Sequence, residues 1–154
     1  MTTRKSAGLL VYRKKNKAVE VFLVHPGGPF WKGKETGAWS IPKGEFNDSE
    51  EPLQAARREF REETGQEVTG QFVELKTVQQ KSGKLVYAWA VEGEVDHENI
   101  VSNTFRLEYP SKSGKWISIP EVDKAAWFSI ADAKEKINPA QVALLDDLLQ
   151  KINS

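Results

Sequence analysis

The chain has 154 residues, enough to bury one sizeable hydrophobic core, and its 39% hydrophobic and 29% charged residues are typical of a soluble globular domain. Its formal net charge of zero gives no general argument for a nucleic-acid or membrane partner, and the absence of cysteine excludes disulfides, thiol nucleophiles and thiolate metal sites. The first apolar run is too short for a signal segment, and no run reaches transmembrane length. We therefore expect one cytoplasmic domain over residues 1–154, with no nucleic-acid partner and no membrane association.

Two strands are predicted near the start of the chain, over residues 6–12 and 19–25, because both ranges are rich in Val, Leu and Phe. The basic turn at residues 13–17 would join them into a hairpin. Its lysines could meet a phosphate, but a solvated turn is the better interpretation. His25 ends the second strand, and no serine or acid is tied to it by sequence, so a catalytic triad is unsupported.

A loop rich in proline, glycine and aromatic residues is predicted from residue 26 to residue 38. Long ordered loops are often functional. Phe30, Trp31 and Trp39 could stack on a nucleobase, since aromatic rings offer flat apolar faces. For all three, a role unrelated to a ligand stays open, and Trp39 could simply begin the strand that follows.

An acidic helix is predicted after this strand. At 3.6 residues per turn, Glu59, Glu62 and Glu63 share one face, beside an apolar stripe that would pack on a core. The stripe comprises Leu53, Ala56, Phe60 and Thr64. Like charges at this spacing destabilise a helix by roughly 0.2–0.5 kcal/mol per pair. The spacing alone leaves two interpretations open, a solvated surface helix and a site for a hard divalent cation that takes oxygen ligands.

The ends of this helix can also be read from the sequence. Asp48 or Ser49 is expected to cap its N-terminus, and Pro52 is tolerable in the first turn. Gly65 is expected to end it as a left-handed C-terminal glycine.

Strands are predicted over residues 67–80 and 84–91, joined by a turn at Ser82 and Gly83, and a polar loop is predicted over residues 96–103. Residues 112–115 form a basic turn. A short helix is expected from about residue 131 to residue 137. After Asn138 and Pro139, a closing helix presents Val142, Leu145, Leu149 and Ile152 on one face, a pattern that core packing explains.

The segment from Gly44 to Gln66 reads GEFNDSEEPLQAARREFREETGQ and resembles the signature of the Nudix hydrolases, G-x5-E-x7-R-E-U-x-E-E-x-G-U, in which U is bulky and apolar. All charged and glycine positions of the pattern match. Phe60 is aromatic where an aliphatic residue is usual. Gln66 is polar at the last apolar position, and Val68 is expected to supply the missing apolar contact.

The resemblance implies an α+β fold in which a mixed β-sheet lies between helices, as an α/β/α sandwich. It also implies hydrolysis of a phosphoanhydride bond with Mg2+ as cofactor and Mn2+ as a substitute. The metal ligands that it implies are Glu59, Glu63, Glu62 and the carbonyl of Lys43. Arg58 would orient Glu59 and partly neutralise its charge. Glu50 would lie behind these residues, without binding the metal itself.

The general base is left open between Glu59 and a glutamate in a loop. In this family a glutamate about six residues before a Trp-Phe pair commonly faces the metal, and Glu121 stands at that distance from Trp127. Glu108 and Asp123 are its competitors, and a solvated loop carboxylate is the alternative. The side chain of Lys43 could bind a phosphate as a point charge or be a solvent lysine.

Two functions remain possible at this point. The first is an enzyme acting on a small nucleotide, namely a nucleoside triphosphate or a dinucleoside polyphosphate, with a nucleotide sugar as a further option. The second is a sensor of the same fold that binds a nucleotide without cleaving it. The chain is expected to be a monomer or a homodimer.

Overall fold

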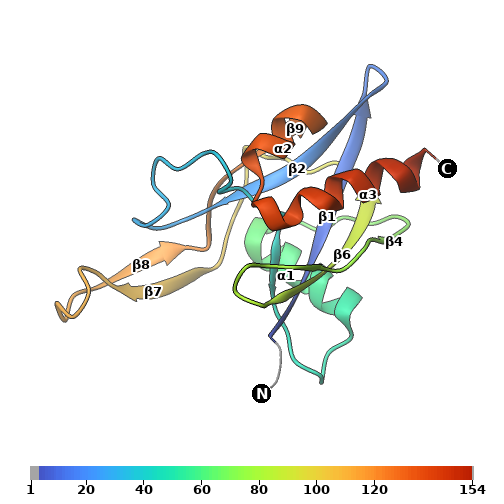
Figure 1. Ribbon diagram of the computed structural model, residues 1–154. Helices are drawn as coiled ribbons and strands as arrows, with labels where there is room; N and C mark the ends of the chain where they lie inside the picture. The colour runs from blue at the N-terminus through green and yellow to red at the C-terminus, as the bar shows by residue number, and fades with distance from the viewer. Residues whose placement is uncertain (1–3, 154) are drawn as a thin grey trace.

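The computed structural model describes residues 4–153 and contains a mixed sheet between helices, with α3 in front of the sheet and α1 behind it in Figure 1. This is the α+β sandwich expected from the sequence. The main sheet has seven strands, in the order β4-β6-β1-β2-β9, with β3 paired to β1 and β5 paired to β6. Its strands are β1 (Lys5–Lys15), β2 (Ala18–Pro26), β3 (Lys43–Glu45), β4 (Val73–Glu74), β5 (Val78–Gln79), β6 (Leu85–Glu92) and β9 (Val122–Ser129).

Strands β1 and β2 form the predicted antiparallel hairpin, which turns at Asn16 and Lys17, both in the left-handed region. β1 also pairs in parallel with β6. Parallel neighbours need a long crossover, and the chain between them contains α1 (Pro52–Thr64).

Side chains alternate between the two faces of the sheet, and each face carries a separate hydrophobic core. On β1, Leu10 faces the core that contains α3 (Val142–Ile152), whereas Leu9 and Val11 face the core that contains α1. The helix α1 is therefore held by packing along a whole face, which fixes the positions of its polar residues.

The predicted boundaries of α1 are partly right. Gly65 ends the helix in the left-handed conformation, and its backbone N–H donates to the Arg61 carbonyl. The predicted N-cap is wrong. Glu51 takes that place without a side-chain cap, because Asp48 pairs with Lys5 and Ser49 hydrogen bonds to Asn47.

The polar residue at the end of the signature has a clear structural role. The side-chain amide of Gln66 accepts from the Asp96 backbone N–H and donates to the Asp96 carbonyl, both at 2.9 Å. These two hydrogen bonds hold the loop over residues 96–103 next to the C-terminal end of α1. Val68 is buried in the core beside α1, as expected.

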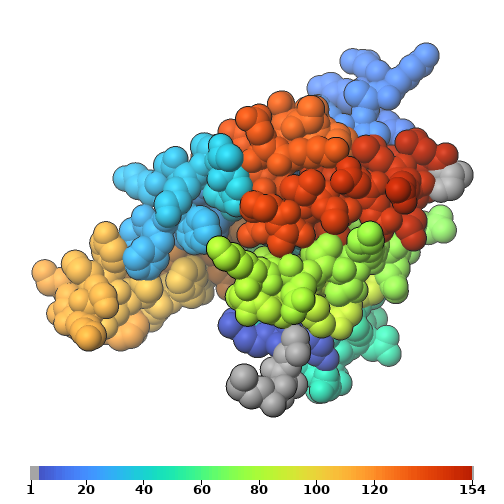
Figure 2. Space-filling view, in the orientation of Figure 1, coloured from blue at the N-terminus to red at the C-terminus, as the bar shows by residue number. Residues whose placement is uncertain are grey.

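The strand predictions are wrong in two regions. The long strand expected over residues 67–80 is reduced to β4 and β5. Residues 104–120, expected only to contain a basic turn, form a separate two-stranded sheet of β7 (Thr104–Glu108) and β8 (Trp116–Pro120). This hairpin projects from the main body beside the loop after β2 (Figure 2).

The C-terminal part follows the prediction closely. α2 covers Ile130–Lys136, a short 3-10 helix covers Pro139–Gln141, and α3 follows it directly. No helix within residues 4–153 is long and apolar enough to cross a membrane.

Candidate active site

A pocket of about 590 Å³ gathers most of the predicted site residues. Five glutamates line it, three from α1, one from β3 and one from the junction of β8 and β9, together with two lysines and two aromatic rings. The lining residues are Ser6, Pro26, Gly27, Trp31, Lys43, Gly44, Glu45, Glu59, Glu62, Glu63, Lys84, Phe105 and Glu121. A smaller cavity of about 330 Å³ beside α1 has three arginines in its wall but none of these glutamates, so we place the chemistry in the larger one.

Glycine at position 44 allows Glu59 to lie against the backbone of β3. A Cβ atom at this position would lie only 2.0 Å from Glu59 Oε2, so any side chain there would displace the carboxylate. Glu59 is 8% exposed, and burial raises its pKa. The signature therefore requires glycine at this position, because any side chain would clash with the Glu59 carboxylate.

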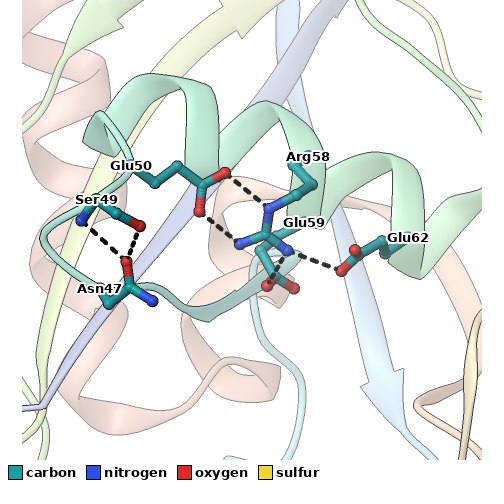
Figure 3. Close-up of polar contacts among 6 residues, drawn as sticks. All are labelled: Asn47, Ser49, Glu50, Arg58, Glu59 and Glu62. Atoms are coloured by element: carbon teal, nitrogen blue, oxygen red, sulfur yellow. Dashed lines mark hydrogen bonds and ion pairs between the residues drawn. The ribbon is translucent and has the colours of Figure 1, made fainter.

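Arg58 binds three carboxylates at once (Figure 3). Its Nε and Nη2 donate to the two oxygens of Glu50 at 2.8 and 2.9 Å, and its Nη1 donates to Glu59 at 2.9 Å and Glu62 at 3.1 Å. Hydrogen bonding to Arg58 lowers the pKa of Glu50. Arg58 thus lies where the family resemblance requires it to orient Glu59.

Glu63 carries the strongest electrostatic strain of the pocket. Burial, then the charges of Glu121 and Glu59, raise its pKa to about 9. The nearby Lys43 offsets this only in part, since burial and Lys84 lower the pKa of Lys43 itself. The pocket therefore holds more negative charge than its own cations neutralise.

The chemistry of the donors fits a hard cation, although the side chains are not arranged around one. Among residues 4–153, no group of three or more His, Cys, Asp or Glu side chains has the arrangement of a metal site. Oxygens of Glu59 and Glu62 instead accept from Arg58. Carboxylates on one pocket wall are the ligands that Mg2+ and Mn2+ prefer, and a change of rotamer would release them from Arg58.

Glu121 is the only one of the three competing loop carboxylates that lines this pocket. Its backbone is fixed on both sides, since its N–H donates to the Asn103 carbonyl at 2.8 Å and its carbonyl accepts from Gly27 at 3.1 Å. Burial, then the charge of Glu62, raise its pKa. Glu108 instead accepts from backbone N–H groups at the tip of the hairpin, and Asp123 pairs with His25.

The aromatic residues predicted to bind a base are separated by the fold. Trp31 lines the pocket and is 40% exposed, whereas Phe30 is exposed outside it and packs edge-on against Tyr109. Trp39 is only 3% exposed and packs against Phe128 and His25, so its proposed stacking on a base is wrong and its role is in the core. Phe105 lines the pocket and was missed because its strand was not predicted.

His25 joins two segments that border the pocket. The buried ring lies with Nδ1 at 2.8 Å from Asp123 Oδ1 and Nε2 at 2.6 Å from the Lys34 carbonyl. Each ring nitrogen therefore lies against an oxygen of a different segment. His25 thus connects the loop after β2 to β9. The sequence could not predict this contact, because His25 and Asp123 are 98 residues apart.

The comparisons with known proteins agree with this geometry. The profile of the family described as NUDIX domain matches residues 2–148. Comparison with curated protein sequences gave no match.

Several solved structures share the fold. An Ap4A hydrolase binary complex from C. elegans is 22% identical with a TM-score of 0.67, and 98% of each chain is covered. The NUDIX domain of Shewanella oneidensis NrtR complexed with ADP ribose is 15% identical with a TM-score of 0.67, covering 99% of this chain and 90% of that one. The E. coli ORF135 protein is 20% identical with a TM-score of 0.57, covering 96% and 91%.

Proposed function

The chain belongs to the NUDIX domain family and is a hydrolase acting on phosphorus-containing anhydrides, and we propose that it is a Mg2+-dependent pyrophosphohydrolase of nucleoside triphosphates or dinucleoside polyphosphates. One observation carries the proposal. Five glutamates, two lysines and two exposed aromatic rings line a single pocket, and these groups suit a cation, phosphates and a base respectively. Mn2+ is a substitute cofactor with the same preference for oxygen ligands.

Glu59, Glu62, Glu63 and the carbonyl of Lys43 would hold the cation. When bound, it neutralises charge that develops on the phosphoryl oxygens and lowers the pKa of water. The chain itself must hold those carboxylates on the pocket wall, and Arg58 does this for Glu59 and Glu62 until a change of rotamer turns them to the cation. The raised pKa of Glu63 supports the same role, because a bound cation would offset both the cost of burying its charge and the repulsion from Glu121 and Glu59.

Glu121 is the general base in this proposal. The oxygen of water forms a bond to phosphorus, the bridging P–O bond of the anhydride breaks, and the proton of water passes to the Glu121 carboxylate. Burial raises its pKa towards the working range of a base at neutral pH. Glu59 is a weaker candidate, since one of its oxygens already accepts from Arg58.

Trp31 supplies the stacking face for the base, and its position in the pocket supports this. Phe30 contributes indirectly by packing on Tyr109 of the hairpin. The cytoplasmic location and the state as a monomer or homodimer stay predictions from the sequence.

A non-catalytic nucleotide sensor is the second candidate, and a nucleotide-sugar hydrolase is the third. The observation that favours both is the similar NUDIX domain complexed with ADP ribose. The presence of Glu59, Glu62 and Glu63 in one pocket with Glu121 favours the enzyme over the sensor.

A panel of nucleotides assayed with Mg2+, with Mn2+ and with excess chelator tests the proposal. We expect turnover of a nucleoside polyphosphate that stops when chelator is added. Reaction in oxygen-18 water then identifies the attacked phosphorus from the labelled product. Turnover that survives the chelator would contradict the metal mechanism, and tight binding without turnover would favour the sensor.

A further inference from the structure

Exposed apolar side chains are concentrated on the hairpin of β7 and β8 and on the loop after β2. Of the seven large apolar side chains that are exposed within residues 4–153, six belong to these two segments. Single exposed apolar residues are common on soluble proteins, whereas a concentration of them marks a surface that binds a ligand or a partner. The six residues are Phe30, Trp31, Phe105, Tyr109, Trp116 and Ile117.

The register of the hairpin assigns its rings to two different faces. Trp116 lies opposite Glu108. The pairing continues one residue beyond β7, where the Tyr109 N–H donates to the Lys115 carbonyl at 2.9 Å. Paired residues share a face and successive residues alternate, so Phe105 and Tyr109 lie on one face and Trp116 lies on the other.

The loop after β2 adds two rings to the face of Phe105 and Tyr109, and the loop and the hairpin lie side by side in Figure 2. Phe30 packs edge-on against Tyr109 with ring centroids 6.0 Å apart, while Trp31 and Phe105 both line the candidate active-site pocket. We call these four rings the ring strip. Strand geometry places Phe105 and Tyr109 about 14 Å apart, so the strip continues well beyond the pocket.

The same two segments also concentrate positive charge. Residues 28–34 and 104–120 contain five lysines and arginines but one glutamate, so this region has a net charge of +4 in a chain whose formal net charge is zero. The five cations, Lys32, Lys34, Arg106, Lys112 and Lys115, are exposed, and none has an ion-pair partner within residues 4–153. The glutamate, Glu108, accepts from the backbone N–H groups of Lys112 and Gly114 at 3.2 and 3.0 Å. The positive charge of this region therefore attracts an anionic partner.

The arrangement of rings and lysines favours single-stranded nucleic acid among anionic partners. Lys34 Nζ lies 5.6 Å from the centroid of the Trp31 ring, so a cation stands beside a flat apolar face. A single strand alternates bases with phosphates, and it binds where rings stack on the bases and cations meet the phosphates. A hairpin that enters a membrane surface would instead carry its rings at the tip, but the tip over residues 110–115 contains no aromatic residue.

We propose that the ring strip and its lysines bind single-stranded nucleic acid, with consecutive bases on the rings and phosphates at Lys34, Lys112 and Lys115. This binding is separate from the proposed hydrolysis, because Phe30 and Tyr109 lie outside the pocket. It departs from the expectation of no nucleic-acid partner, which was based on the net charge of the whole chain. A sum over the chain does not reveal a local concentration of charge.

Fluorescence anisotropy with labelled strands of about twelve nucleotides tests the proposal. The strands carry a 5′-hydroxyl group and the buffer contains chelator, so neither hydrolysis nor a terminal phosphate affects binding. We expect saturable binding of the RNA strand, the DNA strand or both, and at least about tenfold weaker binding of a duplex, whose bases already stack on each other. No binding of either strand, or equal binding of the duplex, would overturn the proposal.

Variants of Tyr109 test the stacking of bases on the ring strip. Tyr109→Ala should raise the Kd at least about fivefold, whereas Tyr109→Trp should keep the wild-type Kd. Tyr109→Leu fills space against Phe30 without an aromatic face, so it should bind as weakly as Tyr109→Ala. Trp116→Ala is the matched control, since this ring is also exposed but lies on the opposite face of the hairpin. Equal Kd values for Tyr109→Ala and Trp116→Ala, or wild-type binding by Tyr109→Leu, would overturn the assignment.

The salt dependence of the Kd tests the lysines. Each phosphate contact contributes about 0.7 to the slope of log K against log salt concentration on a single strand. Lys112→Gln combined with Lys115→Gln should therefore reduce the slope by about 1.4. Arg106→Gln, on the face of Trp116, should leave it unchanged. A reduction in Arg106→Gln as large as that per lysine would indicate diffuse attraction and overturn the placement of the strand on this face.

Two other anions distinguish nucleic acid from different partners. Poly-glutamate offers negative charge without bases, and vesicles of anionic phospholipid offer a membrane surface. We expect both to bind at least about tenfold more weakly than the single strand. Binding of either as tight as that of the strand would overturn the proposal. If the wild type cleaved no nucleotide, the proposed function would fail, while these titrations would still decide whether the ring strip binds nucleic acid.

Discussion

Helix α1 and the hairpin of β7 and β8 border the same pocket but are held in place differently. The helix buries Ala55, Ala56 and Phe60 against the main sheet. The hairpin pairs only with itself and leaves Phe105 and Trp116 exposed. Because a two-stranded hairpin has little stability of its own, the helix can fix carboxylates for chemistry whereas the hairpin offers an adaptable surface. We therefore expect changes in α1 to act on kcat and changes around the hairpin to act on KM.

Glu63→Gln should have the largest effect on activity. It removes a negative charge from the metal-binding wall, and we expect kcat to fall by roughly a thousandfold, or about 4 kcal/mol, with little change in the fold. Steady-state kinetics over a range of Mg2+ concentrations measure the loss and the weaker metal binding. A rate within about threefold of the wild type, or about 0.65 kcal/mol, would show that the ligand assignment is wrong.

The same contrast explains how far the sequence could predict the site. The arrangement of Glu59, Glu62 and Glu63 follows from local helical spacing, and one fixed-length signature connects them to Gly44 and Arg58. The strand around Phe105 is mostly exposed, so hydrophobic alternation gives little sign of it. The burial of Trp39 depends on contacts that only the fold creates, with Phe128 and with the segment at Ile137.

Glu121→Gln tests the border between the two regions, because this residue follows the hairpin and faces the helix. As the loss of a general base, it should lower kcat by about a hundredfold. At saturating Mg2+, which keeps the metal-binding carboxylates ionised, it should also remove the acidic limb of the pH–rate profile. Asp123→Asn, two residues further along in β9, is the control. A pH–rate profile that keeps its acidic limb in Glu121→Gln would assign the base to another residue.

Trp31→Ala tests the recognition side of the pocket. Loss of a stacking ring costs about 1–3 kcal/mol per base, so KM should rise about tenfold while kcat changes little. Phe30→Ala, which removes a ring outside the pocket, should have a smaller effect on KM. If Trp31→Ala lowered kcat and left KM unchanged, the division between chemistry on α1 and recognition by the loop would be incorrect.

The last expected effect is on the stability of the metal-free protein, and it centres on Glu63 of α1. Burial and neighbouring carboxylates raise the pKa of Glu63 from 4.5 to about 9 in the folded state. The folded state therefore binds a proton more tightly than the unfolded state, and this stabilisation is complete below about pH 4.5 and is lost as the pH rises towards about 9. Lys43, whose pKa burial lowers from 10.5, acts in the opposite direction as the pH rises towards 10.5.

Thermal unfolding of metal-free protein at several values between about pH 5 and 7.5 measures this dependence. We expect the melting temperature of the wild type to fall by several degrees as the pH rises, and Glu63→Gln to show a shallower slope because it cannot ionise at this position. Saturating Mg2+ should flatten the wild-type slope as well, since a cation replaces the proton in offsetting the negative charge. Trp31→Ala should keep the wild-type slope. Parallel slopes for the wild type and Glu63→Gln would mean that the buried carboxylate is not the source of the pH dependence, and would remove the electrostatic reason for assigning the cation to this wall of the pocket.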